Sequence, residues 1–195
     1  MSSKKLDDKP QNLNSHQENP WVVKGKEVRY SNPWIEVAHH DVTNPAGNPG
    51  VYGTVHFKNR AVGVVPLAEN GDTWLVGQYR FPLGEFHWEI PMGGAPLDEV
   101  PEQCALRELE EEAGLIAERI QSLGKFHLSN CITDEVGYLF VAQGLTEGEQ
   151  AWEETEVLMI KRLPFEEAFA MAQDGRITDV LSVLALTKIR LAGIA

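Results

Sequence analysis

The segment that decides the fold runs from Pro101 to Leu115, PEQCALRELEEEAGL, and it contains five glutamates. An α-helix turns by about 100° per residue, so the spacing i, i+3, i+4 places Glu108, Glu111 and Glu112 on one face. Like charges at this spacing repel by a few tenths of a kcal/mol, which a counter-charge would offset. Mg²⁺ binds carboxylate oxygens while it keeps waters and substrate phosphates in its shell. The segment therefore predicts either a cation-binding helix face or, as for most glutamate runs, a solvated surface.

A second side of the same helix is apolar. Leu106, Leu109 and Ala113 follow the i, i+3, i+7 spacing of a stripe that packs on a core. Pro101 suits the first turn of a helix, and Gly114 suits the left-handed conformation that ends one. The helix is therefore expected to be buried on one side and charged on another.

Residues upstream of the helix favour the cation-binding interpretation. Gly93 is followed by five residues and Glu99, then by seven residues and the run RELEEEAGL, 107–115. This spacing resembles the signature of the Nudix hydrolases, which is G, five residues, E, seven residues, R-E-U-x-E-E-x-G-U, where U is a bulky aliphatic residue. All nine constrained positions are met. Nine positions at fixed spacing are far more specific than a lone glycine-rich loop.

The resemblance implies a fold and a metal site. The fold would be α/β (α+β), the α/β/α sandwich of the Nudix family with a mixed sheet, preceded here by N-terminal antiparallel strands. Glu108, Glu111, Glu112 and the backbone carbonyl of Met92 would bind Mg²⁺, or Mn²⁺. Arg107 would form an ion pair with Glu99, and we expect Arg107, Glu111 and Glu112 to take part in catalysis. Metals held by carboxylates would neutralise a pyrophosphate and acidify a bound water.

Residues outside the signature resemble one subfamily, the ADP-ribose and nucleotide-sugar pyrophosphatases. In QYRFPLGEFHWEIPMGG, 78–94, Arg80 would meet a substrate phosphate and Glu89 would line the pocket near the ribose. Trp88 would either stack on the base or belong to the core. The acidic segment TEGEQAWEETEV, 146–157, would supply the catalytic base, with Glu153 as first choice and Glu154 as second.

Composition limits the class of partner and the compartment. The chain has 195 residues, 43% hydrophobic content and a net charge of −12, which indicates one main domain and argues against nucleic-acid binding through phosphates. Two cysteines without a CxxC pair fit a reducing compartment. No apolar run has membrane-spanning or signal-peptide character, so we expect no membrane contact and a cytoplasmic location.

The chain divides into three parts. Residues 1–20 are polar and predict a flexible tail. Residues 21–58 contain three β-branched runs separated by turn signals, and they predict an antiparallel sheet. Extra strands of this kind resemble those of the ADP-ribose and nucleotide-sugar pyrophosphatases, and the resemblance implies a role in dimerisation and substrate binding. Residues 59–195 would form the Nudix domain. Within it, Asn70-Gly71-Asp72 predicts a hairpin between the runs at 61–69 and 73–80, and helices are expected at 164–173 and 178–191.

These observations predict Mg²⁺-dependent hydrolysis of nucleoside diphosphate sugars by a homodimer, with ADP-ribose first and AMP and ribose 5-phosphate as products. The pattern departs from the ADP-ribose enzymes at Cys131, where they commonly carry proline, so GDP-mannose is the alternative substrate. Clean-up of nucleoside triphosphates is a second enzymatic alternative. A Nudix-like module that senses a nucleotide sugar without catalysis is the alternative from another class.

Overall fold

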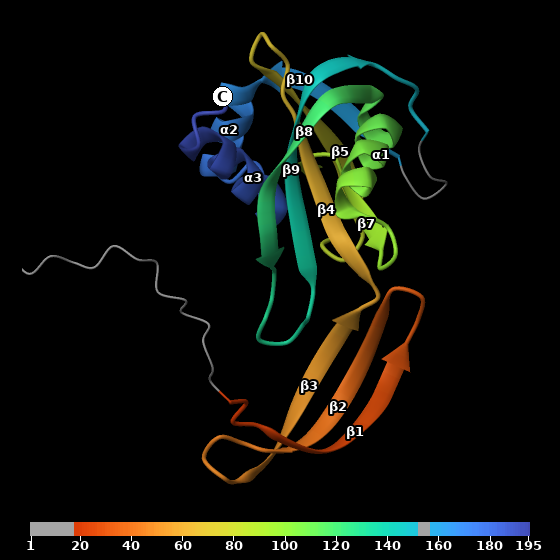
Figure 1. The fold of residues 1–195 in the computed structure, drawn as a ribbon, viewed down its shortest axis with the longest axis vertical. Helices are drawn as coiled ribbons and strands as arrows, with labels where there is room; N and C mark the ends of the chain where they lie inside the picture. Colours follow the sequence, from red (N-terminus) through yellow and green to blue (C-terminus); the bar gives the residue numbers. More distant parts are fainter. Residues whose placement is uncertain (1–17, 152–156) are drawn as a thin grey trace, which may run out of the picture.

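The computed structural model describes residues 18–151 and 157–195. It contains ten strands and three helices, arranged as a small N-terminal sheet joined to a larger unit in which helices lie on both sides of paired sheets (Figure 1). The strands are β1 (Val22–Ser31), β2 (Ile35–Thr43), β3 (Pro49–Phe57), β4 (Asn59–Pro66), β5 (Asp72–Arg80), β6 (Glu85–Glu89), β7 (Met92–Pro96), β8 (Leu115–His127), β9 (Val136–Glu147) and β10 (Met159–Pro164). The helices are α1 (Pro101–Ala113), α2 (Phe165–Gln173) and α3 (Val180–Leu191).

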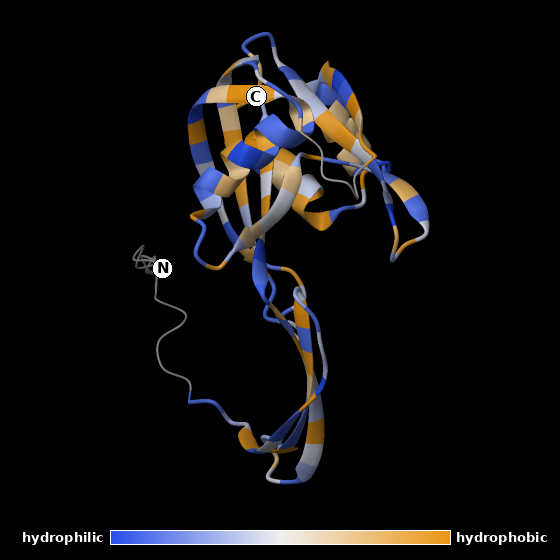
Figure 2. Cartoon of the chain, turned by 90° about the vertical axis from the view of Figure 1, so that its right-hand side faces the viewer, coloured by the Kyte–Doolittle hydropathy of each residue, from blue (hydrophilic) through white to orange (hydrophobic). Residues whose placement is uncertain are grey.

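The N-terminal sheet has the order β1-β2-β3 with antiparallel pairing, as the sequence predicts. Most of β1 is exposed, and polar and apolar residues alternate along these strands (Figure 2). Ala38 and Val42 of β2 are buried. The predicted tail, 1–20, lies almost wholly outside the described residues.

The larger unit contains two sheets, with orders β7-β4-β9-β8 and β10-β5-β6. The four-stranded sheet is mixed because β4 and β9 run parallel while the other pairs are antiparallel. The expected mixed-sheet α/β/α sandwich is therefore confirmed. Helix α1 lies on one side, and α2 and α3 lie on the other (Figure 1).

Strand β4 faces both hydrophobic cores, which explains its unbroken apolar sequence AVGVV. Val62 and Val64 pack with Leu109 of α1, whereas Val65 packs with Leu186 of α3. A strand covered on both faces has no polar side, so it does not alternate in hydropathy. This burial fixes the position of α1 above the sheet and so the position of its glutamates.

The predicted hairpin around Asn70-Gly71-Asp72 is wrong beyond the turn. Gly71 has φ 84° and donates its N–H to the carbonyl of Ala68, as expected for a tight turn. However, β4 and β5 belong to different sheets, and Leu67, just after β4, forms only an isolated bridge with Thr73. The turn chemistry set the local chain reversal, while non-local pairing with β9 and β10 decided which sheet each strand joined.

The N-terminal sheet is attached to the larger unit through the loop between β8 and β9. Asp134 accepts the backbone N–H of Phe57 at 2.9 Å and contacts Nδ1 of His56 at 2.5 Å. Tyr52 donates its hydroxyl to the carbonyl of Cys131 at 2.5 Å, and the backbone N–H of Val55 donates to Ile132. Strand β3 is therefore tied at its outer edge to a loop almost 80 residues later in the chain.

Candidate active site

Helix α1 has the ends that its sequence predicts. Pro101 is in the first turn, and Gly114 adopts the left-handed conformation with φ 66° and ψ 36°. The N–H of Gly114 bonds back to the carbonyls of Leu109 and Glu110, which satisfies groups that the helix end would otherwise leave unpaired. Leu109 and Ala113 are buried as expected, whereas Leu106 is half-buried.

The glutamates of α1 differ in exposure although they share a face. Glu108 is 7% exposed and Glu112 is 2% exposed, whereas the side chain of Glu111 is 36% exposed. Carboxylates are rarely buried this deeply unless they are paired or bind a metal. This burial excludes the solvated-face interpretation of the glutamate run.

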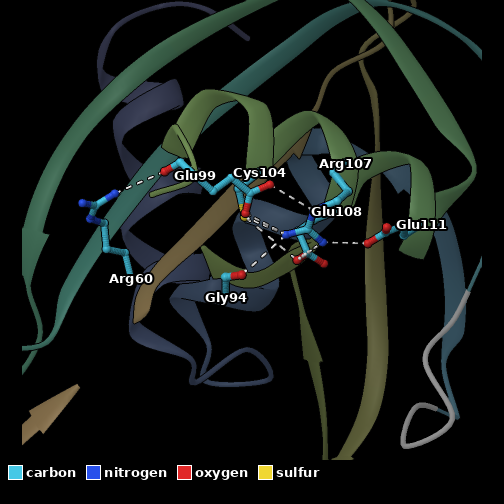
Figure 3. Close-up of polar contacts among 7 residues, drawn as sticks. All are labelled: Arg60, Gly94, Glu99, Cys104, Arg107, Glu108 and Glu111. Carbon is cyan, nitrogen blue, oxygen red and sulfur yellow. Dashed lines mark hydrogen bonds and ion pairs between the residues drawn. The ribbon is translucent and has the colours of Figure 1, made fainter. Parts of the chain in front are cut away.

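Arg107 lies between the loop and the charged face of α1 (Figure 3). Its Nε and Nη2 each lie 3.1 Å from the carboxylate of Glu99, which confirms the expected ion pair. Its Nη1 donates to both Glu108 and Glu111 at 2.8 Å. The hydrogen bonds that Arg107 donates to Glu99, together with the nearby charge of Glu108, raise the pKa of Arg107 above its ordinary range.

The loop before α1 approaches the glutamates through its backbone. The N–H of Met92 donates to Oε2 of Glu112 at 2.8 Å. A Cβ atom added to Gly93 would overlap the carboxylate of Glu108, so a side chain at 93 would displace that carboxylate. Gly93 therefore allows close approach between the loop and the helix.

The donors of this site suit a hard divalent cation because they are carboxylate oxygens. Within residues 18–151 and 157–195, no group of three or more His, Cys, Asp or Glu side chains is arranged to hold a metal ion. Arg107 already bonds Glu108 and Glu111, and Met92 directs its N–H toward Glu112. For Glu108, Glu111 and Glu112 to converge on a cation, Glu108 and Glu111 would have to give up their hydrogen bonds with Arg107 and bind the cation in their place. The ligand role expected for the Met92 carbonyl stays a prediction.

Arg80 and Glu89, both expected to contact substrate, pair with each other. Arg80 ends β5 opposite Glu85, whereas Glu89 ends β6 opposite Val76. The long Arg80 side chain therefore reaches along the strand pair to meet Glu89. Nε of Arg80 lies 2.9 Å from Oε1 of Glu89, and Nη2 also contacts Oε2. The bond with Glu89, and the nearby charges of Asp179 and Glu112, raise the pKa of Arg80. Glu89 is therefore the group that holds the Arg80 guanidinium.

Two other predicted residues have less defined positions. Trp88 is half-buried, packs against the core beside α3 and makes an edge-to-face contact with Phe86. This favours the core interpretation over base stacking. Glu153 and Glu154 lie outside the described residues, so the choice of catalytic base stays a prediction.

Other residues, not predicted from the sequence, also approach the signature. Trp34 and Asn59 line a cavity of about 500 Å³ together with Gly93, Gly94, Arg107 and Glu108. The side chain of Cys104, buried in α1, accepts from Nη2 of Arg107 at 3.4 Å, and burial raises its thiol pKa to about 12. The signal available in the sequence for Trp34 was a tryptophan directly after the turn residues Ser31-Asn32-Pro33.

Comparison with known proteins identifies the class. The NUDIX domain model matches residues 57–181, which is more than half of the chain. The chain therefore belongs to the NUDIX family. Its fold and its relatives make it a Nudix pyrophosphohydrolase.

Among the relatives, two are named as pyrophosphatases and one is named as an activator of another enzyme. ADP-ribose pyrophosphatase of Bacillus subtilis is 30% identical over 168 residues, covering 85% of this chain and 90% of that protein. Methanol dehydrogenase activator of Bacillus methanolicus is 33% identical over 172 residues, covering 87% and 92%. GDP-mannose pyrophosphatase of Yersinia pestis is 34% identical over 143 residues, covering 68% and 67%.

A solved structure shares the fold. The crystal structure of an ADP compounds hydrolase superposes with a TM-score of 0.82 at 22% identity, covering 93% of this chain and 99% of that one. The coverage includes the N-terminal sheet as well as the NUDIX domain. In the part of the chain that is described, no helix is long and apolar enough to span a bilayer.

Proposed function

We propose that this chain hydrolyses the pyrophosphate of nucleoside diphosphate sugars with Mg²⁺, or Mn²⁺, and that ADP-ribose is its preferred substrate. The products would be AMP and ribose 5-phosphate. The observation that supports this most is the buried position of Glu108 and Glu112 beside Gly93. The similarity to ADP-ribose and GDP-mannose pyrophosphatases supports the substrate class.

Each residue of the site would have a separate task. A bound divalent cation would neutralise charge on the pyrophosphate and lower the pKa of a water. Glu108, Glu111 and Glu112 would hold it through their carboxylates. Arg107 and Glu99 would fix the loop against α1, so that Gly93 and Gly94 present backbone toward the phosphates. Arg107, freed from Glu108 and Glu111, would remain paired with Glu99.

Arg80 would bind a phosphate oxygen of the substrate. A guanidinium offers a planar fork of donors that matches phosphate geometry. Glu89 occupies one side of that fork, which leaves the other donors of Arg80 to reach a ligand. Glu153, or Glu154, would accept the proton of the attacking water.

GDP-mannose is the alternative substrate, and Cys131 is the residue that favours it over strict ADP-ribose specificity. A non-catalytic nucleotide-sugar sensor is the alternative from another class. The complete set of signature glutamates disfavours that alternative, because a sensor has no need of a cation that activates a water for attack on a pyrophosphate.

A substrate panel tests the proposal. ADP-ribose, GDP-mannose, UDP-glucose and dATP would be offered with Mg²⁺, with Mn²⁺ and with chelator, and product nucleotides would be separated by chromatography. We expect the highest kcat/KM for ADP-ribose and no turnover with chelator. Turnover that persists in chelator, or dATP as the best substrate, would overturn the proposal.

We further propose that the chain is a homodimer assembled through its N-terminal sheet. Val22, Val23, Val28 and Tyr30 on β1 are each at least 46% exposed, which is unusual for an edge strand of a monomer. Light scattering after gel filtration at micromolar concentration should give twice the chain mass of 21.7 kDa. A monomer mass would contradict it.

A further inference from the structure

A cavity of about 240 Å³ adjoins the candidate active site at the end of β6. Its polar lining comes from two distant parts of the chain: Arg80, His87 and Glu89 on β5 and β6, and Thr178 and Asp179 just before α3. Pro82 and Leu83 close one side of it. Pockets for drug-sized ligands are typically about 300 to 1,000 Å³, so this cavity suits one part of a nucleotide sugar.

Arg80 lines this cavity, and its guanidinium bonds the carboxylate of Glu89. Glu89 and Met92 are three residues apart, and Met92 bonds Glu112. A pyrophosphate held by Arg80 near Glu112 would therefore place its neighbouring group in the cavity.

The lining has the chemistry of a site for hydroxyl groups. Carboxylates and the Thr178 hydroxyl accept hydrogen bonds, while the guanidinium and the imidazole can donate them. The aromatic residues Phe86 and Trp88 alternate with His87 and Glu89 along β6, so they lie on the opposite face of the strand. A nucleobase would need an apolar or aromatic face to stack on, whereas a sugar needs several donors and acceptors.

Hydrogen bonds hold the two halves of the lining in register. Oδ2 of Asp179 accepts from the N–H and from the hydroxyl of Ser182, at 2.7 and 2.8 Å. The hydroxyl of Ser182 accepts the N–H of Ile90 at 3.0 Å, which ties the start of α3 to the end of β6. Nδ1 of His87 lies 3.2 Å from Oγ1 of Thr178. The lining is thus preorganised across 91 residues of sequence.

His87 has one further feature. Its Nε2 is buried without a hydrogen-bond partner among the described residues, although the Glu85 carboxylate lies 3.6 Å away. A buried polar atom without a hydrogen bond is costly. Among the described residues, the hydrogen bond of Nδ1 with Thr178 is therefore the one that fixes the orientation of the His87 ring.

We propose that this cavity binds the sugar of the substrate, and that Thr178 and His87 determine which sugar is preferred. The inference rests on the proposed function, because it assigns the sugar half of that substrate. Thr178 would contact a sugar hydroxyl, and His87 is a positioning residue that orients the Thr178 hydroxyl.

The test uses substrates that share a base and differ in the sugar: ADP-ribose, ADP-glucose and ADP-mannose. Thr178→Val removes the hydroxyl and keeps the shape, whereas Thr178→Ser keeps the hydroxyl. His87→Phe removes both ring nitrogens, and His87→Asn retains a polar group beside Thr178. Thr187→Val is the matched control, because the Thr187 hydroxyl bonds within α3 to Val183 at 2.7 Å and does not line the cavity.

We expect Thr178→Val and His87→Phe to change the ratio of kcat/KM between ADP-ribose and ADP-glucose by about 10-fold or more, mainly through KM. Thr178→Ser, His87→Asn and Thr187→Val should keep the ratio within about 3-fold. Circular dichroism melting would verify that each variant is folded.

Two failures are distinguishable. Suppose that the wild-type enzyme hydrolyses ADP-sugars. If Thr178→Val and His87→Phe then leave the ratio of kcat/KM values unchanged, or lower kcat/KM equally for all three substrates, the sugar assignment is overturned and the proposed function stands. If the wild-type enzyme hydrolyses none of the three, the proposed function fails and the sugar assignment fails with it.

Discussion

The backbone N–H of Met92 donates to Oε2 of Glu112 at 2.8 Å, which ties the loop before α1 to a buried carboxylate of its charged face. The oxygen of Glu112 is thereby oriented by the loop and not by its own helix alone. This link joins the loop of the signature glycines to the helix of the signature glutamates.

Removing the charge of Glu112 tests its role. We expect Glu112→Gln to lower kcat by about 100-fold or more, because even residues that merely orient metal ligands contribute about 10- to 100-fold. Glu102→Gln, at an exposed position on the same helix, is the control and should change kcat by less than about 2-fold. Steady-state kinetics at saturating Mg²⁺ would measure kcat for both variants and for the wild type. A kcat of Glu112→Gln equal to that of the wild type would contradict the metal-binding role of Glu112.

A methyl group at Gly93 should affect catalysis through Glu108. Because the added Cβ would overlap the Glu108 carboxylate, Gly93→Ala should displace that carboxylate and lower kcat by about 10-fold or more. Gly53→Ala is the matched control, since a Cβ there meets nothing within 4 Å. Unchanged kcat in folded Gly93→Ala would show that close approach of loop and helix is unnecessary.

The Glu99–Arg107 pair should make stability depend on pH. The hydrogen bond from Arg107 lowers the pKa of Glu99 below its ordinary value of 4.5. A carboxyl with a lowered folded-state pKa stabilises the protein above its unfolded pKa, and this stabilisation is lost as pH falls through the folded pKa. Urea midpoints measured from about pH 7 down to about pH 3 should therefore fall more steeply for wild type than for Glu99→Gln. Parallel curves would contradict the pairing.

The acidic segment 146–157 should supply a proton acceptor. We expect Glu153→Gln to lower kcat by about 100-fold, within the range of general-base catalysis, while KM changes little. The acidic limb of the pH–rate profile should also be lost. If Glu154→Gln has this effect and Glu153→Gln has none, the order of the two candidates is reversed.

Local sequence signals predicted the elements well. The ends of α1 followed from Pro101 and Gly114, and the three N-terminal strands followed from turn residues between β-branched runs. These features depend on neighbours within a few residues, so a single sequence contains the information.

Long-range pairing set the rest. Nothing near Gly71 indicates that β5 leaves β4 to pair with β6 and β10. Arg80 bonds Glu89 although Glu85 is its partner in the register of β5 and β6. The contact between His87 and Thr178 joins segments 91 residues apart. Such contacts arise from packing of the whole chain, which periodicity and capping signals do not describe.

The central claim is that the glutamates of α1 bind a divalent cation that acts on a pyrophosphate. Titration of Mn²⁺ into the protein, with free Mn²⁺ followed by electron paramagnetic resonance, tests it most directly. We predict binding to the wild-type protein that is weakened at least about 10-fold in Glu108→Gln and in Glu112→Gln, in parallel with loss of kcat. Equal Mn²⁺ affinity in all three proteins would contradict the claim.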